Sequence, residues 1–322
     1  MTGMNEALEA AAAAVRGAKT LVTTGHISPD GDAFGSALAL ALSARAETRS
    51  AQVCFGGGFV LGDQFSFLDT SPVVEADQVE APDCLVAFDC NDPDRLGEEL
   101  KPVLESAGTV VMIDHHVSGT GFGDIRVADP KAPAAALLCY RLLERLGRPL
   151  TSEVATALLL GLVTDTGRFQ FENTGPEAYR VAANLVEAGA RPEVIGRSVY
   201  ESVPFGYLGV AGAVLSRATL EPEHELVWSY VTLDDLQTHQ LDMADADGLI
   251  DNVRIAKEAE VALLLKEQPD GKWKLSLRSR YRTDVAAIAE TMGGGGHHRA
   301  AGGEFEGTIE AAVEAVRKQL SG

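Results

Sequence analysis

The sequence predicts an α/β protein with a larger N-terminal domain built on a mostly parallel sheet and a smaller C-terminal α/β domain. Over residues 1–190, short apolar runs typical of buried strands alternate with amphipathic helical segments. This alternation is characteristic of a parallel sheet with helices on both faces. The region after about residue 210 instead contains strand patterns joined by a tight turn. A length of 322 residues exceeds the usual size of one domain, so two domains are expected.

The predicted elements follow from apolar runs and from the Pro and Gly residues that bound them. Strands are predicted at residues 20–24, 50–55, 84–88, 109–113, 225–231, 261–265 and 273–278, with a tight turn at 269–272. Helices are predicted at residues 7–15, 37–42, 133–146, 151–164, 176–189, from 192 onward, and at 284–292 and 308–320. We therefore place the domains at residues 1–190 and 211–322, joined by a helical linker over residues 191–210.

Composition limits the class of protein. Hydrophobic residues make up 46% and charged residues 23% of the chain, which is ordinary for a globular protein. No run approaches the ~20 apolar residues of a membrane span. The first six residues lack the basic region and apolar core of a secretory signal, so the sequence predicts a cytoplasmic protein without a membrane partner. The four cysteines show no Cys-x-x-Cys spacing, and buried thiols are expected rather than a zinc site or disulfides.

The net charge of −20 limits the partners of this protein. Binding to long duplex nucleic acid depends on clustered cations that neutralise phosphates, so such a partner is not expected. A small phosphorylated ligand remains compatible with the charge, because bound metal ions supply local positive charge.

The segment around His26, Asp30 and Asp32 is the first candidate site. It lies between an apolar strand and the helix that follows, and such turns lie at the carboxyl edge of the sheet, where α/β folds place their ligands. Carboxylates with an imidazole suit Mn²⁺ or Mg²⁺, with Zn²⁺ as a further candidate. The alternative is that Asp30 shapes the turn, Asp32 caps the helix and His26 has no function.

Three further apolar elements end on the same residue types, which favours the metal site. Asp89 follows the strand at 84–88, and Asp114, His115 and His116 follow the strand at 109–113. Asp165 ends the apolar helix that runs to residue 164. Acids and histidines repeated at the ends of buried elements are the pattern expected of a two-metal site.

Two features of the C-terminal domain suit an anionic ligand. The strand at 273–278 ends on Arg278, followed by Ser279, and a guanidinium group can hold phosphate through paired hydrogen bonds. A glycine run then precedes a histidine pair; the residues concerned are Gly294, Gly295, Gly296 and His297. Consecutive glycines let backbone N–H groups approach an anion closely. The alternative is a mobile loop with exposed histidines.

These motifs, in this order and spacing, resemble the DHH–DHHA1 phosphoesterases, especially the NrnA-type oligoribonuclease and phosphatase branch. The resemblance covers nearly the whole chain. It implies a larger N-terminal domain with a parallel sheet, a smaller C-terminal α/β domain, and a substrate cleft between them. It also implies two Mn²⁺ ions as cofactors, with Mg²⁺ as a substitute, and is compatible with a homodimer.

The resemblance assigns a role to each candidate residue. One Mn²⁺ takes His26, Asp30 and Asp89, and the other takes Asp32, Asp89, His115 and Asp165, with Asp89 as the catalytic bridge. Asp114 orients a ligand histidine, and His116 is a catalytic residue facing the scissile phosphate. Arg278, Ser279, the glycines at 294–296 and His297 bind a substrate phosphate.

The implied reaction is two-metal hydrolysis of a phosphate ester in a short nucleotide. The substrates implied are oligoribonucleotides of a few residues, adenosine 3′,5′-bisphosphate (pAp), and cyclic di-AMP with its linear product. One alternative is a Mn²⁺-dependent inorganic pyrophosphatase, which shares the first four motifs but fits the C-terminal glycine and arginine features less well. Another is a cyclic-dinucleotide-binding protein without turnover, which has no need of so many metal-binding side chains.

Overall fold

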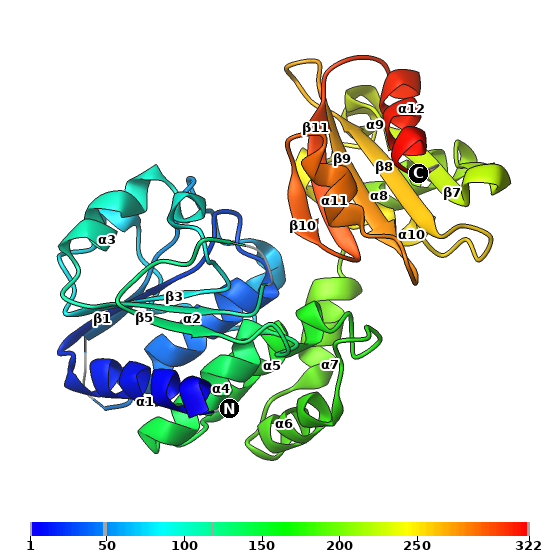
Figure 1. Cartoon of the computed structure of the whole chain (residues 1–322). Helices are drawn as coiled ribbons and strands as arrows, with labels where there is room; N and C mark the ends of the chain where they lie inside the picture. Colours follow the sequence, from blue (N-terminus) through cyan, green and yellow to red (C-terminus); the bar gives the residue numbers. More distant parts are fainter. Residues whose placement is uncertain (1, 48–49, 117–118, 321–322) are drawn as a thin grey trace. The chain divides into compact units, whose positions relative to one another are not determined.

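The computed structural model describes residues 2–47, 50–116 and 119–320, with only the backbone described at Thr2 and His297. The chain forms two compact units, Met1–Ser202 and Val203–Gly322, drawn in Figure 1 in blue to green and in green to red. The boundary between the units lies within the segment 191–210. The residue limits given above for the domains and linker remain a prediction.

The first unit is built on sheet A, in which the described residues form five parallel strands in the order β2-β1-β3-β4-β5. In chain order the strands are β1 (Thr20–Thr24), β2 (Ser50–Val53), β3 (Cys84–Phe88), β4 (Val110–Asp114) and β5 (Ile125–Ala128). The first four were predicted, and the parallel sheet confirms the fold class. β5 was missed, because it has four residues of which only Val127 is buried.

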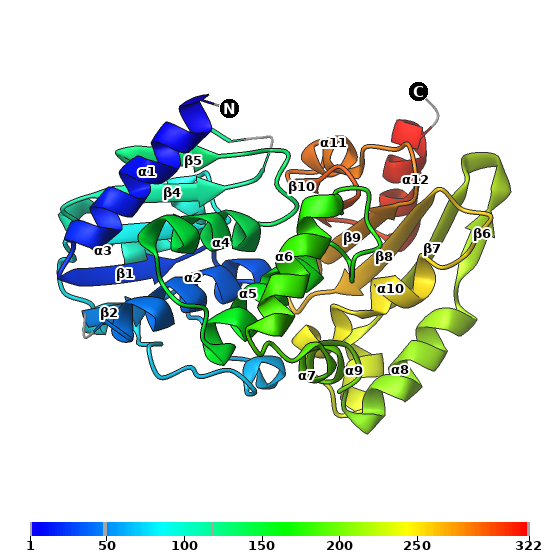
Figure 2. The same cartoon turned by 90° about the horizontal axis from the view of Figure 1, so that it is seen from below.

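Helices cover both faces of sheet A, as Figures 1 and 2 show. The longer ones share one face and the core there; they are α1 (Thr2–Gly17), α2 (Gly31–Arg45), α4 (Ala135–Leu146) and α5 (Ser152–Asp165). The short helix α3 (Lys101–Ser106) covers the other face. The unit ends with α6 (Pro176–Glu187), α7 (Pro192–Ile195) and a π-helical turn, Gly196–Tyr200.

Strand β3 shows why this sheet needs cover on both faces. Cys84, Val86 and Phe88 belong to the core under the long helices. Leu85 and Ala87 point into the core on the α3 side. A strand that buries both of its faces reads as a continuous apolar run, which is why β3 was predictable from sequence.

Glycines let α2 and α5 pack closely. A Cβ added to Gly35 of α2 would lie 2.3 Å from the carbonyl oxygen of Ala157, and one added to Gly161 of α5 would lie 2.6 Å from Oδ1 of Asp32. Neither position can carry a larger side chain without a shift of backbone or of Asp32. The start of α2 and the end of α5 are thereby held side by side.

The second unit is built on sheet B, in which the described residues form six strands in the order β10-β11-β9-β8-β7-β6. In chain order they are β6 (Thr219–Glu221), β7 (Leu226–Val231), β8 (Val261–Glu267), β9 (Trp273–Ser279), β10 (Gly295–His297) and β11 (Ala300–Phe305). β7 and β8 are parallel, and the other pairs are antiparallel. The hairpin predicted between β8 and β9 is confirmed.

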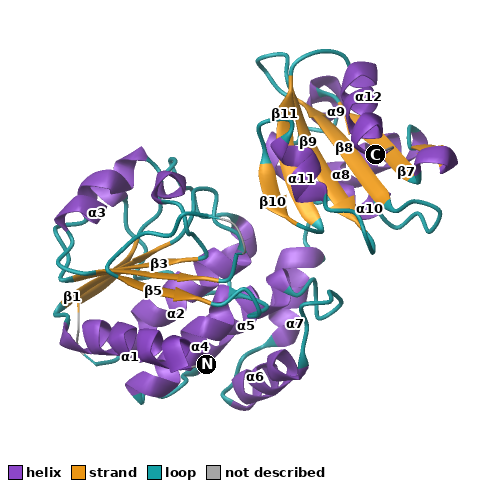
Figure 3. Cartoon of the chain, viewed as in Figure 1, coloured by secondary structure: helices purple, strands orange, loops and turns teal. Residues whose placement is uncertain are grey.

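Helices also lie on both faces of sheet B, seen as purple ribbons beside the orange strands of Figure 3. One core contains residues of α11 (Val285–Glu290) and α12 (Ile309–Leu320). The other contains residues of α8 (Phe205–Ser216), α9 (Leu233–Thr238) and α10 (Leu249–Val253). The helices α11 and α12 were predicted, whereas α8, α9 and α10 were not, because glycines and short length conceal their periodicity. The described residues also form 3₁₀ turns at Asp63–Phe65, Ala76–Gln78, Pro93–Leu96, Glu98–Leu100, Pro222–His224 and Met243–Ala246.

Two expectations from composition can be compared with the structure. All four cysteines are buried free thiols, as predicted. In the described segments, none of the helices combines the length and apolar character that a bilayer crossing demands.

A glycine pair tests the contact between α2 and α5. We expect Gly35→Ala to lower the free energy of unfolding by about 1–3 kcal/mol, because the new methyl group overpacks the contact. As a control, Gly212→Ala in the middle of α8 has no atom within 4 Å of its added Cβ, so higher helix propensity should stabilise it by about 0.5–1 kcal/mol. Thermal and urea unfolding of both variants measure the difference; equal effects would contradict the close packing.

Candidate active site

The candidate site forms where β1, β3, β4 and α5 end and α2 begins. His26 lies two residues after β1, Asp89 directly follows β3, and Asp165 is the last residue of α5. His115 and His116 follow β4, which ends on Asp114. Because the carboxyl ends of parallel strands meet at one edge of the sheet, residues far apart in sequence converge there.

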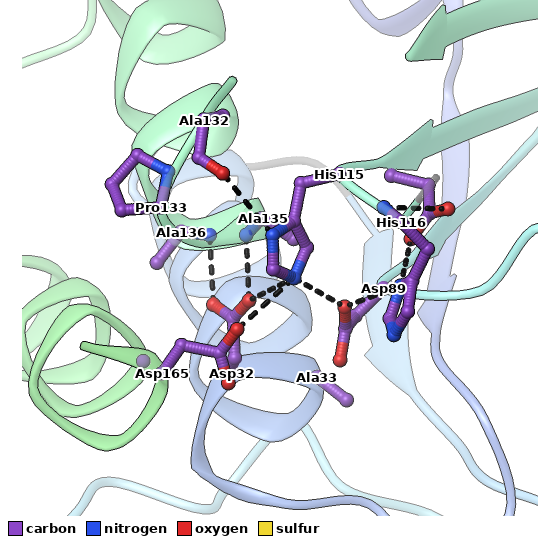
Figure 4. A network of polar contacts seen from close by, with 12 residues as sticks. Asp32, Ala33, Asp89, His115, His116, Ala132, Pro133, Ala135, Ala136 and Asp165 are labelled. Atoms are coloured by element: carbon purple, nitrogen blue, oxygen red, sulfur yellow. Dashed lines mark hydrogen bonds and ion pairs between the residues drawn. The ribbon is translucent and has the colours of Figure 1, made fainter. Parts of the chain in front are cut away.

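Three groups of candidate metal ligands have their ligand atoms within 4.8 Å of one another. The groups are His26, Asp30 and Asp89; Asp32, His115 and Asp165; and Asp89, His115 and His116. Every residue predicted as a metal ligand therefore belongs to a group. Asp89 and His115 each belong to two groups, so they connect the whole cluster (Figure 4).

Asp89 lies at the centre of the cluster. Its Oδ2 is 3.5 Å from Nε2 of His26, and its Oδ1 is 3.2 Å from Nε2 of His115. Oδ1 is buried and accepts no hydrogen bond within the described part of the chain. The backbone of Asp89 is left-handed, with φ of 54°, a conformation that costs a non-glycine residue roughly 1–2 kcal/mol. Such strain is typical of functional sites.

Backbone carbonyls fix the orientation of two histidine rings. Nδ1 of His26 lies 2.8 Å from the oxygen of Ile27, and Nδ1 of His115 lies 3.2 Å from the oxygen of Ala132. A neutral ring that donates its Nδ1–H to a carbonyl carries its lone pair on Nε2. In both histidines Nε2 is the atom that faces the carboxylates, as a metal ligand requires.

Asp32 is fully buried and holds the start of α4. Its Oδ2 accepts a hydrogen bond from the amide of Ala135 at 2.6 Å, and its Oδ1 accepts one from Ala136 at 2.8 Å. The helix cap proposed as an alternative role for Asp32 is thus wrong for α2. Asp30 caps α2 instead, by accepting hydrogen bonds from Asp32 and Ala33.

Asp114 orients His116. Nδ1 of His116 lies 2.7 Å from Oδ1 of Asp114, and the backbone amide of His116 donates to Oδ2. The sequence had assigned Asp114 to a ligand histidine; in the structure its partner is the histidine predicted to be catalytic. With Nδ1 held by a carboxylate, Nε2 on the opposite edge of the ring is the atom placed to exchange a proton.

Burial and neighbouring charges shift the pKa values of three residues in the cluster. Burial, with Asp165 and Asp89 nearby, raises the pKa of Asp32 well above its usual value. Burial also raises the pKa of Asp165 to about 6. Burial lowers the pKa of His115, but the neighbouring Asp165 and Asp89 outweigh it and raise the value to about 12. The metal-free cluster therefore retains protons at neutral pH in place of a cation.

The donor chemistry fits a divalent metal ion. The cluster combines carboxylate oxygens with imidazole nitrogens and contains no thiolate, which suits hard or borderline cations. Buried carboxylates are costly unless they are paired or coordinate a metal. The buried Oδ1 of Asp89, which faces His115, and the two Nε2 atoms aimed inward are the contacts that a cation would complete.

The predicted phosphate-binding residues lie together at one end of β9, β10 and β11. The register pairs Arg278 with Ala300, and Ala300 with His297. Because side chains alternate along a strand, Arg278 and Ser279 point to opposite faces of sheet B. Arg278 is half-buried and donates a hydrogen bond to the carbonyl of Leu277, whereas Ser279 donates to the carbonyl of His298.

The glycine run is a strand edge rather than the mobile loop considered as an alternative. Gly295, Gly296 and His297 form β10, and a Cβ on Gly294 would lie 2.0 Å from the oxygen of Gly302. The amide of Gly294 donates to Ala289, so this N–H is committed within the fold. The side chain of His297 lies outside the described atoms.

Several groups that shape the site carried no sequence signal. They are the carbonyls of Ile27 and Ala132 and the amides of Ala135 and Ala136. Backbone groups are present at every position, so no residue type marks them. Asn173 was also missed; its Nδ2 donates to the carbonyls of Asp165 and Pro133 and ties the end of α5 to the segment before α4.

Comparison with known proteins identifies the class and the family. The model of the DHH family, N-terminal domain, matches residues 20–162, and that of the DHHA1 domain matches residues 226–322. Fold and matches together define a hydrolase of phosphoric esters. The chain belongs to the DHH family and carries a DHHA1 domain, which confirms the resemblance found in the sequence.

Individual relatives agree with this assignment. A bifunctional oligoribonuclease and PAP phosphatase NrnA from Thermus thermophilus is 34% identical over 92% of this chain and 89% of its own length. The cyclic-di-AMP phosphodiesterase PdeA from Listeria monocytogenes is 25% identical over 85% of this chain and 43% of its own. The crystal structure of an exopolyphosphatase-related protein from Bacteroides fragilis has a TM-score of 0.91 and 26% identity, covering 98% of this chain and 96% of that one.

The raised pKa values of Asp165 and His115 predict how metal binding depends on pH. An ion must displace protons from Asp165 and His115, so binding should strengthen as pH rises. In the metal-free protein, both raised pKa values contribute stability at low pH. For Asp165 it is lost as pH rises from about 4 to 6, and for His115 above about 6.5. We therefore expect Mn²⁺ to raise the melting temperature more at pH 8 than at pH 5.5.

Differential scanning fluorimetry with and without Mn²⁺ measures this shift. Glu80→Gln, an exposed acid outside the cluster, should behave as the parent does, whereas Asp165→Asn should reduce the shift at both pH values. A shift that is the same at both pH values would show that Mn²⁺ does not replace these protons.

Proposed function

We propose that this protein hydrolyses phosphoric esters of short nucleotides at a centre of two Mn²⁺ ions. His26, Asp30 and Asp89 would hold the first ion. The second would be held by a set that also includes Asp89: Asp32, Asp89, His115 and Asp165. The observation that carries the proposal is that the two carboxylate oxygens of Asp89 face two different ligand groups, one through His26 and one through His115.

When bound, a pair of divalent cations lowers the pKa of water toward neutral and offsets negative charge on phosphoryl oxygens. The residues supply the remaining steps. The carbonyls of Ile27 and Ala132 keep Nε2 of His26 and His115 aimed at the centre. Asp114 holds Nδ1 of His116, so that Nε2 can stabilise the phosphoryl group or protonate the leaving oxygen.

In this proposal the second unit contributes the residues that bind the substrate. Arg278, Ser279, His297 and the backbone of the glycine run at 294–296 bind a substrate phosphate, with the N–H of Gly294 excepted because it already donates to Ala289. The alternation of Arg278 and Ser279 assigns them to different contacts, because their side chains lie on opposite faces of β9. A guanidinium group is suited to phosphate through paired donors.

The substrates we propose are oligoribonucleotides of a few residues, linear and cyclic dinucleotides such as cyclic di-AMP, and pAp. The activities for which the Thermus and Listeria relatives are named support this class. The charge of −20 favours short ligands over long duplexes, because long duplexes need an extended cationic surface.

The bridging role of Asp89 predicts the effect of its removal. Asp89→Asn keeps the size of the side chain but loses the charge shared by both ions. We expect kcat/KM to fall by more than the roughly 10–100-fold lost when a group that only orients a ligand is removed, since neither cation would keep its full ligand set. Glu80→Gln serves as the control and should retain parental activity. Near-parental Mn²⁺-dependent hydrolysis by Asp89→Asn would show that the bridge is wrongly assigned.

A panel of substrates tests the proposed class. Cyclic di-AMP, linear pApA, a five-residue RNA, pAp and pyrophosphate should be offered side by side with Mn²⁺, and kcat/KM compared. We expect the nucleotides to be preferred over pyrophosphate. Preferred turnover of pyrophosphate would favour the pyrophosphatase alternative, and tight cyclic di-AMP binding without any turnover would favour the binding-protein alternative.

Arg278 should act on substrate binding. We expect Arg278→Ala to raise KM about tenfold or more with a smaller change in kcat, the signature of lost binding rather than lost chemistry. Lys274→Ala changes an exposed cation on the same face of β9 and is the matched control. A loss confined to kcat would contradict a binding role.

A further inference from the structure

The turn that orients His115 is itself held by an ion pair. The carbonyl of Ala132 receives the contact from Nδ1 of His115 (Figure 4). The amide of Ala132 donates to the carbonyl of Asp129 at 2.9 Å, and the amide of Asp129 donates to the carbonyl of Asp114 at 3.0 Å. The backbone of Asp129 is thus hydrogen-bonded both to Asp114 at the end of β4 and to Ala132, whose carbonyl orients His115.

Arg141 of α4 forms an ion pair with the carboxylate of Asp129. Its Nη1 donates to Oδ2 of Asp129 at 3.1 Å, while its Nε and Nη2 donate to Glu177 of α6 at 2.7–3.0 Å. The side chains of Arg141 and Asp129 are 23% and 21% exposed, so solvent screens this pair only in part. The planar guanidinium fork bridges two carboxylates at fixed angles, which a lysine cannot do.

We infer that Arg141 and Asp129 are positioning residues for the metal centre. They act through the Asp129–Ala132 turn, which presents one carbonyl to Nδ1 of His115 and thereby fixes the direction of Nε2. Neither residue belongs to a ligand group, and neither has been assigned a role above. The inference deepens the proposed function and rests on its metal centre.

Physical precedent supports an effect on metal binding. Groups that hydrogen-bond the distal nitrogen of a ligand histidine fix its tautomer and direction, and their loss commonly costs about 10–100-fold in metal affinity. The Arg141–Asp129 pair lies one step further from the ring, so an effect near the lower end of that range is expected. Loosening the turn should lower affinity for the ion without altering the ligands.

The chain offers a matched control seven residues away. Arg148, two residues after the end of α4, donates from Nε and Nη2 to Glu47, and the side chain of Arg148 is only 1% exposed. This ion pair joins the segment after α4 to the segment after α2, so it lies at the C-terminal end of α2, remote from the end that carries Asp30 and Asp32. Breaking it tests whether any buried ion pair around α4 affects metal binding.

The experiment measures Mn²⁺ affinity of the full-length metal-free protein by calorimetric titration, together with melting temperature in chelator. We expect Asp129→Asn and Arg141→Gln each to weaken Mn²⁺ binding about tenfold, and the double variant to be no weaker than the more affected single variant, because both act as one unit. Glu47→Gln should lower the melting temperature but bind Mn²⁺ within about twofold of the parent. If Asp129→Asn fails to fold, Arg141→Lys gives the same comparison.

The outcomes separate this inference from the proposed function. Unchanged Mn²⁺ affinity in the Asp129 and Arg141 variants, or an equal loss in Glu47→Gln, would overturn the positioning role. A parent that binds Mn²⁺ but hydrolyses no nucleotide would overturn the proposed substrates and leave the positioning result intact. A parent that binds no Mn²⁺ would overturn the metal centre and the inference with it.

Discussion

The convergence of Asp32, Asp89 and Asp165 is the constraint on which the first unit depends. These three carboxylates come from three different elements, and two of them are almost fully buried. Burying charges in this way is costly unless opposite charge accompanies them. The histidines offset part of this cost, and a bound cation would offset the rest. Much of the local structure serves to hold these like charges together.

The packing of α2 against α5 shows how the fold enforces this arrangement. Gly35 lies against the backbone of Ala157, and Gly161 lies against the carboxylate of Asp32. A larger residue at either position would separate the two helices and move Asp32 away from Asp165. The same glycines that lower helix propensity therefore permit the approach on which the site depends.

Backbone groups do much of the orienting. A backbone carbonyl orients each of two histidine rings. At the start of α4 the N-cap residue is Ala134, whose side chain cannot accept a hydrogen bond, and Asp32 instead accepts hydrogen bonds from the amides of Ala135 and Ala136. Asp32 can therefore satisfy a helix terminus with part of its lone pairs and still offer others to a metal. Asp32 does not cap α2, as the alternative from the sequence had it, but its contact with α4 shows that a structural role and metal binding are compatible in one residue.

Side chains at the ends of apolar elements were predictable from the sequence, whereas contacts that depend on the backbone or on tertiary packing were not. The convergence of His26, Asp89, His115 and Asp165 could be predicted from sequence because each comes at the end of an apolar element. Three of these elements are parallel strands whose ends meet at one edge of sheet A, and the fourth is α5. The contact of Asp32 with Ala135 spans 103 positions and depends on tertiary packing, which local patterns do not encode. Strands β10 and β11 were missed because glycine and alanine give no strand pattern, although their pairing requires small residues there. β5 was too short and too exposed to stand out.

Candidate metal ligands can be predicted from sequence more readily than the groups that orient them, because only the ligands require particular side chains. Metal ligands must be specific residue types, so they mark the sequence, whereas the groups that aim them are carbonyls and amides available at any position. The Asp129–Ala132 turn illustrates the consequence: a charged pair becomes meaningful only after its backbone is seen to contact His115. Residues that act through the backbone are therefore identified from contacts, and Arg141 is distinguished from Arg148 by what its partner holds rather than by its own burial or charge.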